Sequence, residues 1–182
     1  MTSVTYEDDC LPNKIYLNIH YTGKGAFIAV YDRMKETMKK VWEVESKDWW
    51  ERLFRYDTPD GSFQATMFVD KTLDRFSKLV IEVQMQGLQP LDGSDGFVDI
   101  NFGGVIKTTF GGNSVIENFD NPIYRLTVRL YRLWFYDKQR RSYLKIWCDK
   151  KLLEFKRTVQ EILNIRPDQG ESLLEQQEAN LI

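Results

Sequence analysis

The recurrence of apolar side chains at every second position in two segments between residues 62 and 86 is the feature that most limits the possible folds of this chain. Apolar residues occupy every second position of SFQATMFVD (62–70), and the same pattern returns within FSKLVIEVQMQ (76–86). Alternation with a period of two is typical of β-strands that bury one face and leave the other in water. A short polar turn joins the two segments, so we expect them to be strands of an antiparallel sheet.

Two helices are predicted before these segments. From Ala26 to Trp42, apolar residues recur at spacings of three and four, and charged residues fill the opposite side, which predicts an amphipathic helix. Ser46 is a suitable N-cap for a second helix, and the turn-forming residues 57–61 would end it. The buried side of this second helix would comprise Trp50, Leu53 and Phe54.

Further strands are predicted on both sides of this region. KIYLNIHY (14–21) alternates cleanly, and FVDINF (97–102) and VIKTTF (105–110) lie on either side of Gly103-Gly104. The glycine pair suits a two-residue hairpin, or it marks a bulge within one long strand. The sequence is compatible with both alternatives.

The stretch YRLTVRLYRLWFYDKQRRSYLKIW (124–147) places arginines among tyrosines and tryptophans. We interpret it as two more strands, which run through Tyr136 and through Cys148 and are joined by a turn at 137–140. In the register that this turn sets, one face of the pair is basic and aromatic. That face would carry Arg132, Trp134, Tyr143, Lys145 and Trp147.

The alternation is inconsistent near the beginning of this stretch. Leu126 and Val128 fit the core, but strict alternation would place both in solvent. It would also turn Arg125 and Arg129 inward, and buried guanidinium groups without partners are costly. We therefore favour a bulge near residues 130–131 that resets the phase. Without a bulge, the two arginines become candidates to bind a carboxylate or a phosphate.

A closing helix follows, which Asp149 can cap and Pro167 would end. The order of one strand, two helices, six strands and a long final helix resembles the helix-grip fold of the START, pollen-allergen and polyketide-cyclase superfamily. The resemblance covers about Lys14 to Ile165 and is carried by the order of elements. It implies an α+β fold in which a curved antiparallel sheet of about six to seven strands wraps around the C-terminal helix. It also implies a cavity between sheet and helix that holds an apolar ligand.

Composition defines the expected ends and surroundings of the chain. We predict a flexible N-terminal arm (1–13), a single α+β domain (14–165) and an acidic, disordered C-terminal tail (166–182). Cys10 and Cys148 do not suggest a disulfide framework, and no segment has the apolar length of a membrane span. The default expectation is therefore a soluble, cytoplasmic protein.

Charge is unevenly distributed along the chain. The net charge is −2, but residues 123–151 carry nine Lys or Arg and two Asp. The chain as a whole is therefore no general polyanion binder, although a local basic surface remains possible.

The leading functional hypothesis is a non-enzymatic protein that binds a small apolar or amphipathic ligand between the sheet and the closing helix. The predicted ligand-binding residues are Phe63, Met67, Val83, Met85, Arg125, Leu126, Val128, Arg129, Phe155 and Val159. The alternative is an RNA- or ribosome-associated module, or a protein-interaction module, that uses the basic aromatic hairpin. The residues of that surface would be Arg132, Trp134, Arg140, Arg141, Tyr143, Lys145 and Trp147.

Recognisable catalytic motifs are absent from the sequence, which has no phosphate-binding glycine loop, dinucleotide fingerprint or nucleophile elbow. His20 is the single histidine, and no obvious nucleophile lies near it in the sequence. DGSDG (92–96) lacks the spacing of a calcium loop, and the Cys and His content barely suffices for a zinc site. We therefore predict no cofactor, no metal site and no catalytic residues, although relatives of the resembled fold include enzymes.

Overall fold

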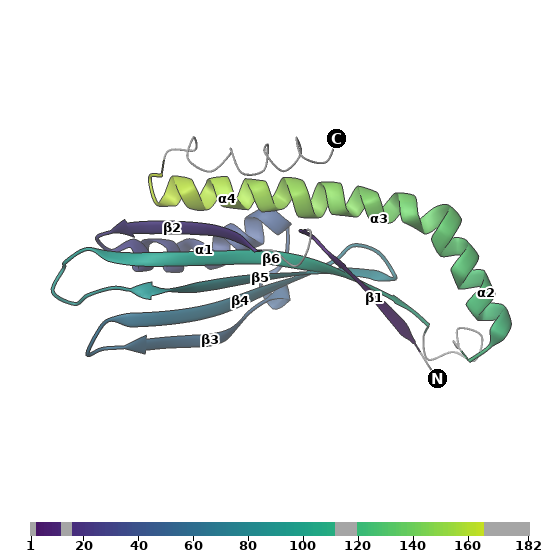
Figure 1. Cartoon of the computed structure of the whole chain (residues 1–182), viewed down its shortest axis with the longest axis horizontal. Helices are drawn as coiled ribbons and strands as arrows, with labels where there is room; N and C mark the ends of the chain where they lie inside the picture. The colour runs from purple at the N-terminus through teal and green to yellow at the C-terminus, as the bar shows by residue number, and fades with distance from the viewer. Residues whose placement is uncertain (1–2, 12–15, 112–119, 166–182) are drawn as a thin grey trace.

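The computed structural model describes residues 3–11, 16–111 and 120–165 and shows an α+β fold, as predicted. Six antiparallel strands form one open sheet, and a long C-terminal helix runs along one face of it (Figure 1). Within these described ranges, no helix is both long enough and apolar enough to cross a lipid bilayer.

The sheet is built around its longest strand. Five strands follow the order β1-β6-β5-β4-β3, and β2 pairs with β6 as well. Residues 96–102 of β6 pair with β2 and residues 105–110 pair with β1, so two short strands share one edge of β6. The strands are β1 (Val4–Asp9), β2 (Leu17–Gly23), β3 (Trp49–Asp57), β4 (Ser62–Thr72), β5 (Ser77–Leu88) and β6 (Gly96–Phe110).

The apolar face predicted from the alternation is the face that the helices cover. Alternate side chains of β4, β5 and β6 are almost completely buried there, under α1 (Ala26–Trp42) and the final helical segment α4 (Lys151–Ile162). The ring centroid of Phe155 lies 5.0 Å from that of Phe102 and 4.9 Å from that of Trp42. Side chains of the protein itself therefore occupy the centre of the space between sheet and helices.

The long helix runs without a break from Pro122 to Ile162. Asn121 begins it, because its side chain accepts a hydrogen bond from the backbone N–H of Ile123 at 3.0 Å, and Pro122 fits the first turn. The part named α4 lies over the sheet, whereas the first part arcs beyond the end of the sheet (Figure 1). Its segments are α2 (Pro122–Tyr131), a π-helical turn (Arg132–Tyr136), α3 (Asp137–Tyr143), a second π-helical segment (Leu144–Lys150) and α4.

The hairpin predicted within 124–147 is therefore wrong. Arg125, Arg129 and Arg132 are spaced by four and three residues, which is a helical spacing, and no glycine or proline interrupts the stretch. Helical hydrogen bonds are local, so the stretch needs no partner strand. The alternation near residues 130–131 is inconsistent because the segment is a helix and not an extended strand, so no bulge is needed to explain it.

Two further predictions about elements differ from the structure. Residues 46–57 form a 3₁₀ turn, η2 (Ser46–Asp48), and the edge strand β3 instead of a second helix. A register shift between Glu51 and Leu53 breaks the alternation of β3, which hides its period in the sequence. Gly103-Gly104 lies inside β6, whose pairing with β5 continues without a shift through both glycines. Neither a hairpin nor a bulge is present there.

The N-terminal segment is tied to the long helix. Residues 4–9, predicted to belong to a flexible arm, form β1, and the adjacent Cys10 forms a disulfide with Cys148, with a Cα–Cα distance of 5.1 Å. The interpretation of the cysteines was wrong because 138 residues separate them, and the tertiary fold alone brings them together. Such a cross-link typically stabilises a domain by about 2–4 kcal/mol. The predicted tail (166–182) lies outside the described residues.

Candidate functional site

A recess of about 360 Å³ lies between the sheet and the long helix, where β1 pairs with β6. One wall comes from these two strands, and the other comes from the first π-helical turn and the beginning of α3. The lining residues are Tyr6, Glu7, Asp8, Thr108, Phe110, Arg132, Leu133, Tyr136, Asp137 and Arg140.

Aromatic rings form the apolar part of the recess. The Phe110 ring lies edge-on to Tyr6 at a centroid distance of 6.2 Å and edge-on to Tyr136 at 5.5 Å. Phe110, Tyr136 and Val128 make up a small buried cluster that is separate from the main core. Phe110 and Tyr136 are each only 2% exposed, so their rings form a packed apolar base, and the less buried Tyr6 forms the upper part of this wall.

Tyr136 also brings a buried hydroxyl to the base of the recess. This hydroxyl is hydrogen-bonded to the hydroxyls of Ser77 and Thr108, the latter at 3.0 Å. Burial raises the pKa of Tyr136 above its ordinary 10.0, although the hydrogen bonds of Ser77 and Thr108 act in the opposite direction. Tyr136 is therefore neutral at physiological pH, and it fixes the helix to β5 and β6.

Ion pairs neutralise most of the charged groups around the recess. Arg140 contacts Asp8 of β1 at 2.5 Å and Asp137, one turn earlier on the helix, at 3.2 Å. Glu7 is paired with Lys107 at 3.0 Å. These pairs hold β1 beside the helix, and their charges are satisfied within the protein.

Arg132 is different from the other charged residues of the recess. Its guanidinium carbon lies 4.2 Å from the centroid of the Tyr6 ring, which is a favourable cation–π distance. No carboxylate within the described ranges pairs with it. Arg132 is exposed as a residue, and the planar set of N–H donors of a guanidinium matches a carboxylate or a phosphate.

A second group of contacts fixes the helix just beyond the recess. The Tyr143 hydroxyl donates a hydrogen bond to Asp74 at 2.9 Å and accepts one from Gln139 at 2.6 Å. Burial is the largest cause of a raised pKa for Tyr143, and Asp74 adds to it. Together with the disulfide at Cys148, this network sets the distance between helix and sheet at the recess.

The structure places the predicted ligand-binding residues in two separate regions. Six are buried in the main core, where they contact other side chains: Phe63, Met67, Val83, Met85, Phe155 and Val159. The other four lie on α2, namely Arg125, Leu126, Val128 and Arg129. Val128 packs against the cluster around Phe110, whereas Leu126 points to solvent. The two groups do not form one site.

The residues of the alternative nucleic-acid surface do not share a face either. Arg140 is held by carboxylates, Tyr143 points to Asp74, and the Trp147 ring packs under the ammonium group of Lys71 at 4.9 Å. Trp134 is exposed. The other members of the predicted surface are Arg132, Arg141 and Lys145. The predicted register was that of a hairpin, and a helix distributes the same residues around its axis.

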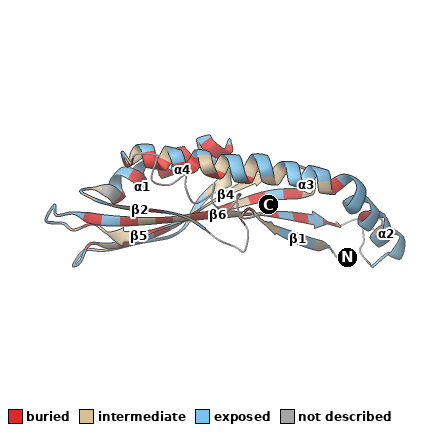
Figure 2. Cartoon of the chain, turned by 45° about the horizontal axis from the view of Figure 1, so that its top comes forward, coloured by how far each residue is buried: buried red, intermediate tan, exposed pale blue. Residues whose placement is uncertain are grey.

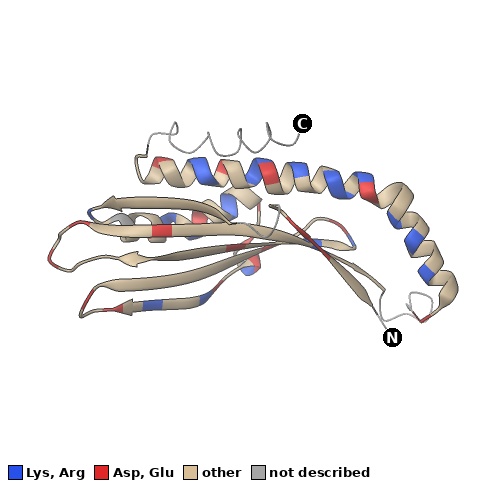
Figure 3. Cartoon of the chain, viewed as in Figure 1, with Lys and Arg blue, Asp and Glu red and all other residues tan. Residues whose placement is uncertain are grey.

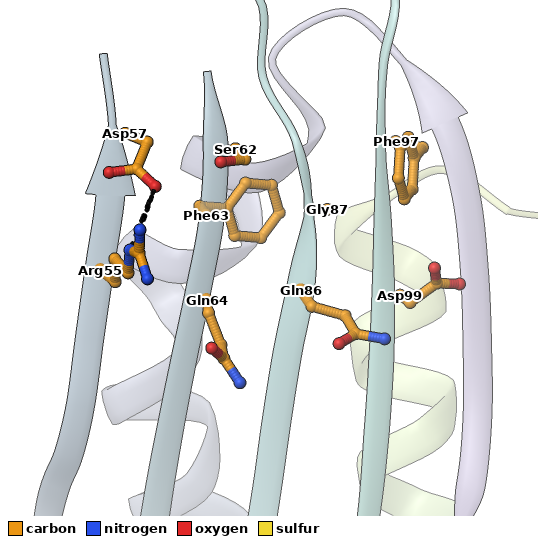
Figure 4. Close-up of a pocket in the computed structure, with 9 residues that line it drawn as sticks. All are labelled: Arg55, Asp57, Ser62, Phe63, Gln64, Gln86, Gly87, Phe97 and Asp99. Carbon is orange, nitrogen blue, oxygen red and sulfur yellow. Dashed lines mark hydrogen bonds and ion pairs between the residues drawn. The ribbon is translucent and has the colours of Figure 1, made fainter. Parts of the chain in front are cut away.

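A broader depression crosses the ends of strands β3 to β6 (Figure 4). Its polar groups include Gln64, Gln86 and Asp99, and the guanidinium of Arg55 is paired with Asp57 at 2.8 Å. Most of these side chains stand on the face of the sheet that the helices leave uncovered. The depression therefore offers little apolar enclosure to a small molecule.

His20 has polar partners that the sequence did not suggest. Its Nδ1 lies 2.6 Å from Asp99 Oδ1, and its Nε2 lies 3.3 Å from the Thr22 hydroxyl. This order of groups resembles a hydrolase triad, but the His20 side chain is 57% exposed on an open sheet face. Such relays act where water is largely excluded, so we interpret this group as a surface hydrogen-bond network. Among the described residues, no cluster suited to a metal ion is present.

Sequence reasoning missed Tyr6, Phe110 and Tyr136 as neighbours. Tyr6 lies in the segment predicted to be a flexible arm, and Tyr136 lies in the segment predicted to be a hairpin. One signal in the sequence could have corrected the second of these assignments. The arginines before Tyr136 have helical spacing, which would have placed Tyr136 on a helix.

No protein-family model and no curated protein matches this chain. Among solved structures, a delta-endotoxin chain is similar with 6% sequence identity and a TM-score of 0.30, over 63% of this chain and 63% of that chain. The match thus spans less than two-thirds of the delta-endotoxin chain. A TM-score this low carries no argument about fold or function.

Proposed function

We propose that this chain is a non-enzymatic binding protein for a small amphipathic molecule, held between the sheet and the long helix in the recess beside Tyr136. The observation that carries this proposal is the position of Arg132, which lies on the Tyr6 ring at an aromatic recess without a carboxylate partner in the described part of the chain. A carboxylate or phosphate attached to an apolar or aromatic body matches this arrangement.

The size and lining of the recess support the same class of ligand. Its volume of about 360 Å³ lies within the usual range for small-molecule sites, about 300–1,000 Å³. Three aromatic side chains line the recess, two of them at its buried base. The paired charges of Asp8 and Arg140 leave Arg132 as the group that would recognise an anion. The ligand would place its apolar end toward Phe110 and its anionic end toward Arg132.

This position differs in one respect from the sequence-based expectation. The centre of the space between sheet and helix is filled by Trp42, Phe102 and Phe155, so we place the ligand nearer the end of the sheet. It still lies between sheet and closing helix, where the helix-grip resemblance would put it. Membership in that superfamily stays a prediction.

RNA binding and a cytoplasmic location also stay predictions. The residues expected to bind RNA are spread around the helix, which gives that function less support. The buried disulfide between Cys10 and Cys148 is more typical of proteins that fold in oxidising compartments.

The proposal is tested with naphthoate and with its uncharged amide. We expect naphthoate to raise the melting temperature and to bind at least about tenfold more tightly than the amide, because a hydrogen bond to a charged group contributes about 1.5–3 kcal/mol. Arg132→Gln should remove this preference, and Tyr6→Ala should weaken both ligands. Binding is measured by calorimetry and by chemical shifts of the recess residues.

The matched control is Arg129→Gln, which removes an exposed arginine from the same helix one turn earlier. It should leave naphthoate binding unchanged, and circular dichroism checks that each variant is folded. Equal affinity for naphthoate and its amide, or equal losses in the two arginine variants, would contradict the proposal.

A further inference from the structure

The first part of the long helix carries an apolar stripe that faces away from the rest of the molecule. We call this stripe the outer ridge; its side chains are between 43% and 74% exposed. Its members are Ile123, Leu126, Leu130, Leu133 and Trp134. They recur at spacings of three and four along the helix, apart from the adjacent pair 133–134, so they form one continuous surface.

The outer ridge lies opposite Val128, which packs against the sheet. Val128 is buried beside Phe110, and the ridge residues from Ile123 to Leu133 are offset from it by about half a turn. The outer surface of this part of the helix is accordingly exposed (Figure 2). A soluble helix normally turns its apolar side inward, so this exposure is a sign of an interaction surface.

Basic side chains run beside the outer ridge. Arg125, Arg129 and Arg132 follow one flank, and residues 122–136 contain no Asp or Glu. Beyond the ridge, basic and acidic side chains are interspersed along the helix (Figure 3), so the segment without acidic residues coincides with the ridge. The partner of the ridge must therefore combine an apolar layer with negative charge.

The shape of the surface limits the partner further. The helix curves toward the sheet (Figure 1). Because Val128 is buried on the inner side of this arc and the ridge side chains are exposed, the ridge lies on the outer, convex side. A convex ridge of long apolar side chains inserts into a soft or flat layer more readily than it receives a partner helix, which needs a groove. Tryptophan at the ridge and arginines at its side match the boundary between lipid headgroups and acyl chains.

We propose that the outer ridge docks the protein on an anionic lipid bilayer, with the helix lying parallel to the surface. Ile123, Leu126, Leu130 and Leu133 enter the boundary of the acyl chains, and Trp134 lies at the level of the headgroups. Arg125 and Arg129 contact lipid phosphates and other anionic headgroups. The ridge borders the ligand recess at Leu133, which also lines the recess, whereas Ile123, Leu126 and Leu130 do not.

A second copy of this chain fits the ridge less well. Antiparallel pairing of two ridges would bring the arginine flank of each copy near that of the other, without a carboxylate in residues 122–136 to offset the repulsion. A single-stranded nucleic acid is also a poorer match. Such ligands stack on aromatic side chains, whereas the ridge is mostly aliphatic.

The experiment uses the full chain and vesicles of phosphatidylcholine with or without about one-third phosphatidylserine. We expect sedimentation with the anionic vesicles and little with the neutral ones. Leu126→Asp with Leu130→Asp should reduce binding at least about tenfold, and each of Arg125→Gln and Arg129→Gln should reduce it about fivefold. The emission of Trp134 should shift to shorter wavelength on anionic vesicles, and Trp134→Phe should remove this shift.

Two matched controls separate the ridge from general surface effects. Leu91→Asp changes a leucine that is 73% exposed in a distant loop, and Lys40→Gln removes an exposed cation from α1; neither should alter vesicle binding. Naphthoate binding should persist in the Leu126→Asp/Leu130→Asp variant. The proposal would be overturned if the chain does not bind anionic vesicles, or if the ridge variants bind them as well as the original chain. It would also be overturned if Leu126 is needed for self-association or for RNA binding and not for vesicle binding.

Discussion

The two halves of the long helix have similar amphipathic sequences but meet the sheet in different ways. In α4, Phe155 and Val159 are completely buried in the main core. In α2, Val128 is the buried residue, whereas Leu126 and, in the π-helical turn that follows, Leu133 remain exposed. Exposed residues predominate along α2 in Figure 2. The more apolar segment, α2, is therefore the less buried one. Apolar side chains that folding does not use remain available for binding.

The distal half of the helix, by which we mean the part before α4 (122–150), is positioned by specific contacts and not by a broad core. The hydroxyl of Tyr136, the ion pair of Arg140 with Asp8 and the disulfide at Cys148 connect it to the sheet. Such contacts define a position without covering much apolar surface. We infer that α4 serves mainly stability, whereas α2 and the π-helical turn after it serve mainly binding.

The largest expected effect compares one residue from each half. Phe155→Ala should lower the free energy of unfolding by about 3–5 kcal/mol, because it removes a ring packed between Phe102 and Trp42. Leu126→Ala should change it by less than about 0.5 kcal/mol, because the side chain is exposed. Urea unfolding measures both, and similar losses in the two variants would break the comparison.

The second effect concerns the junction between the two halves. Replacing both Cys10 and Cys148 by alanine should lower the free energy of unfolding by about 2–4 kcal/mol, and a reductant should have a similar effect on the original chain but none on the variant. Hydrogen exchange should then increase in β1 and the distal helix before it increases in β4 and β5. A uniform increase throughout the sheet would show that the disulfide stabilises the whole domain instead of this junction.

The sequence predicted the half of the molecule in which a single periodicity dominates. The strands that contain Met67 and Val83 have apolar residues at every second position, and the stripe around Phe155 has only helical spacing. Both were assigned to the correct type of element, although the helix was predicted to begin after Asp149, which lies inside it. Around Arg132 and Trp134, two periodicities coexist. There the inconsistent alternation near Leu130 was itself a sign that the segment is not a strand.

The candidate site could not be predicted for a different reason. Tyr6, Phe110 and Tyr136 belong to three elements that are far apart in the sequence and meet only in the folded chain. The disulfide between Cys10 and Cys148 that helps to place these elements has no local signal either. Residues whose role depends on a distant partner carry little information in the periodicity of their own segment.

The smallest expected effect tests whether polar contacts position the distal helix. Tyr136→Phe keeps the ring but leaves the hydroxyls of Ser77 and Thr108 without this partner, which should cost about 1 kcal/mol. The effect should also depend on pH. Because the folded pKa of Tyr136 lies above 10.0, its contribution is complete below pH 10 and is lost as the pH rises through the folded pKa. The difference in unfolding free energy between the original chain and Tyr136→Phe should therefore shrink above pH 10. A difference that stays constant in alkaline solution would mean that the ring, and not the hydroxyl, fixes the helix to the sheet.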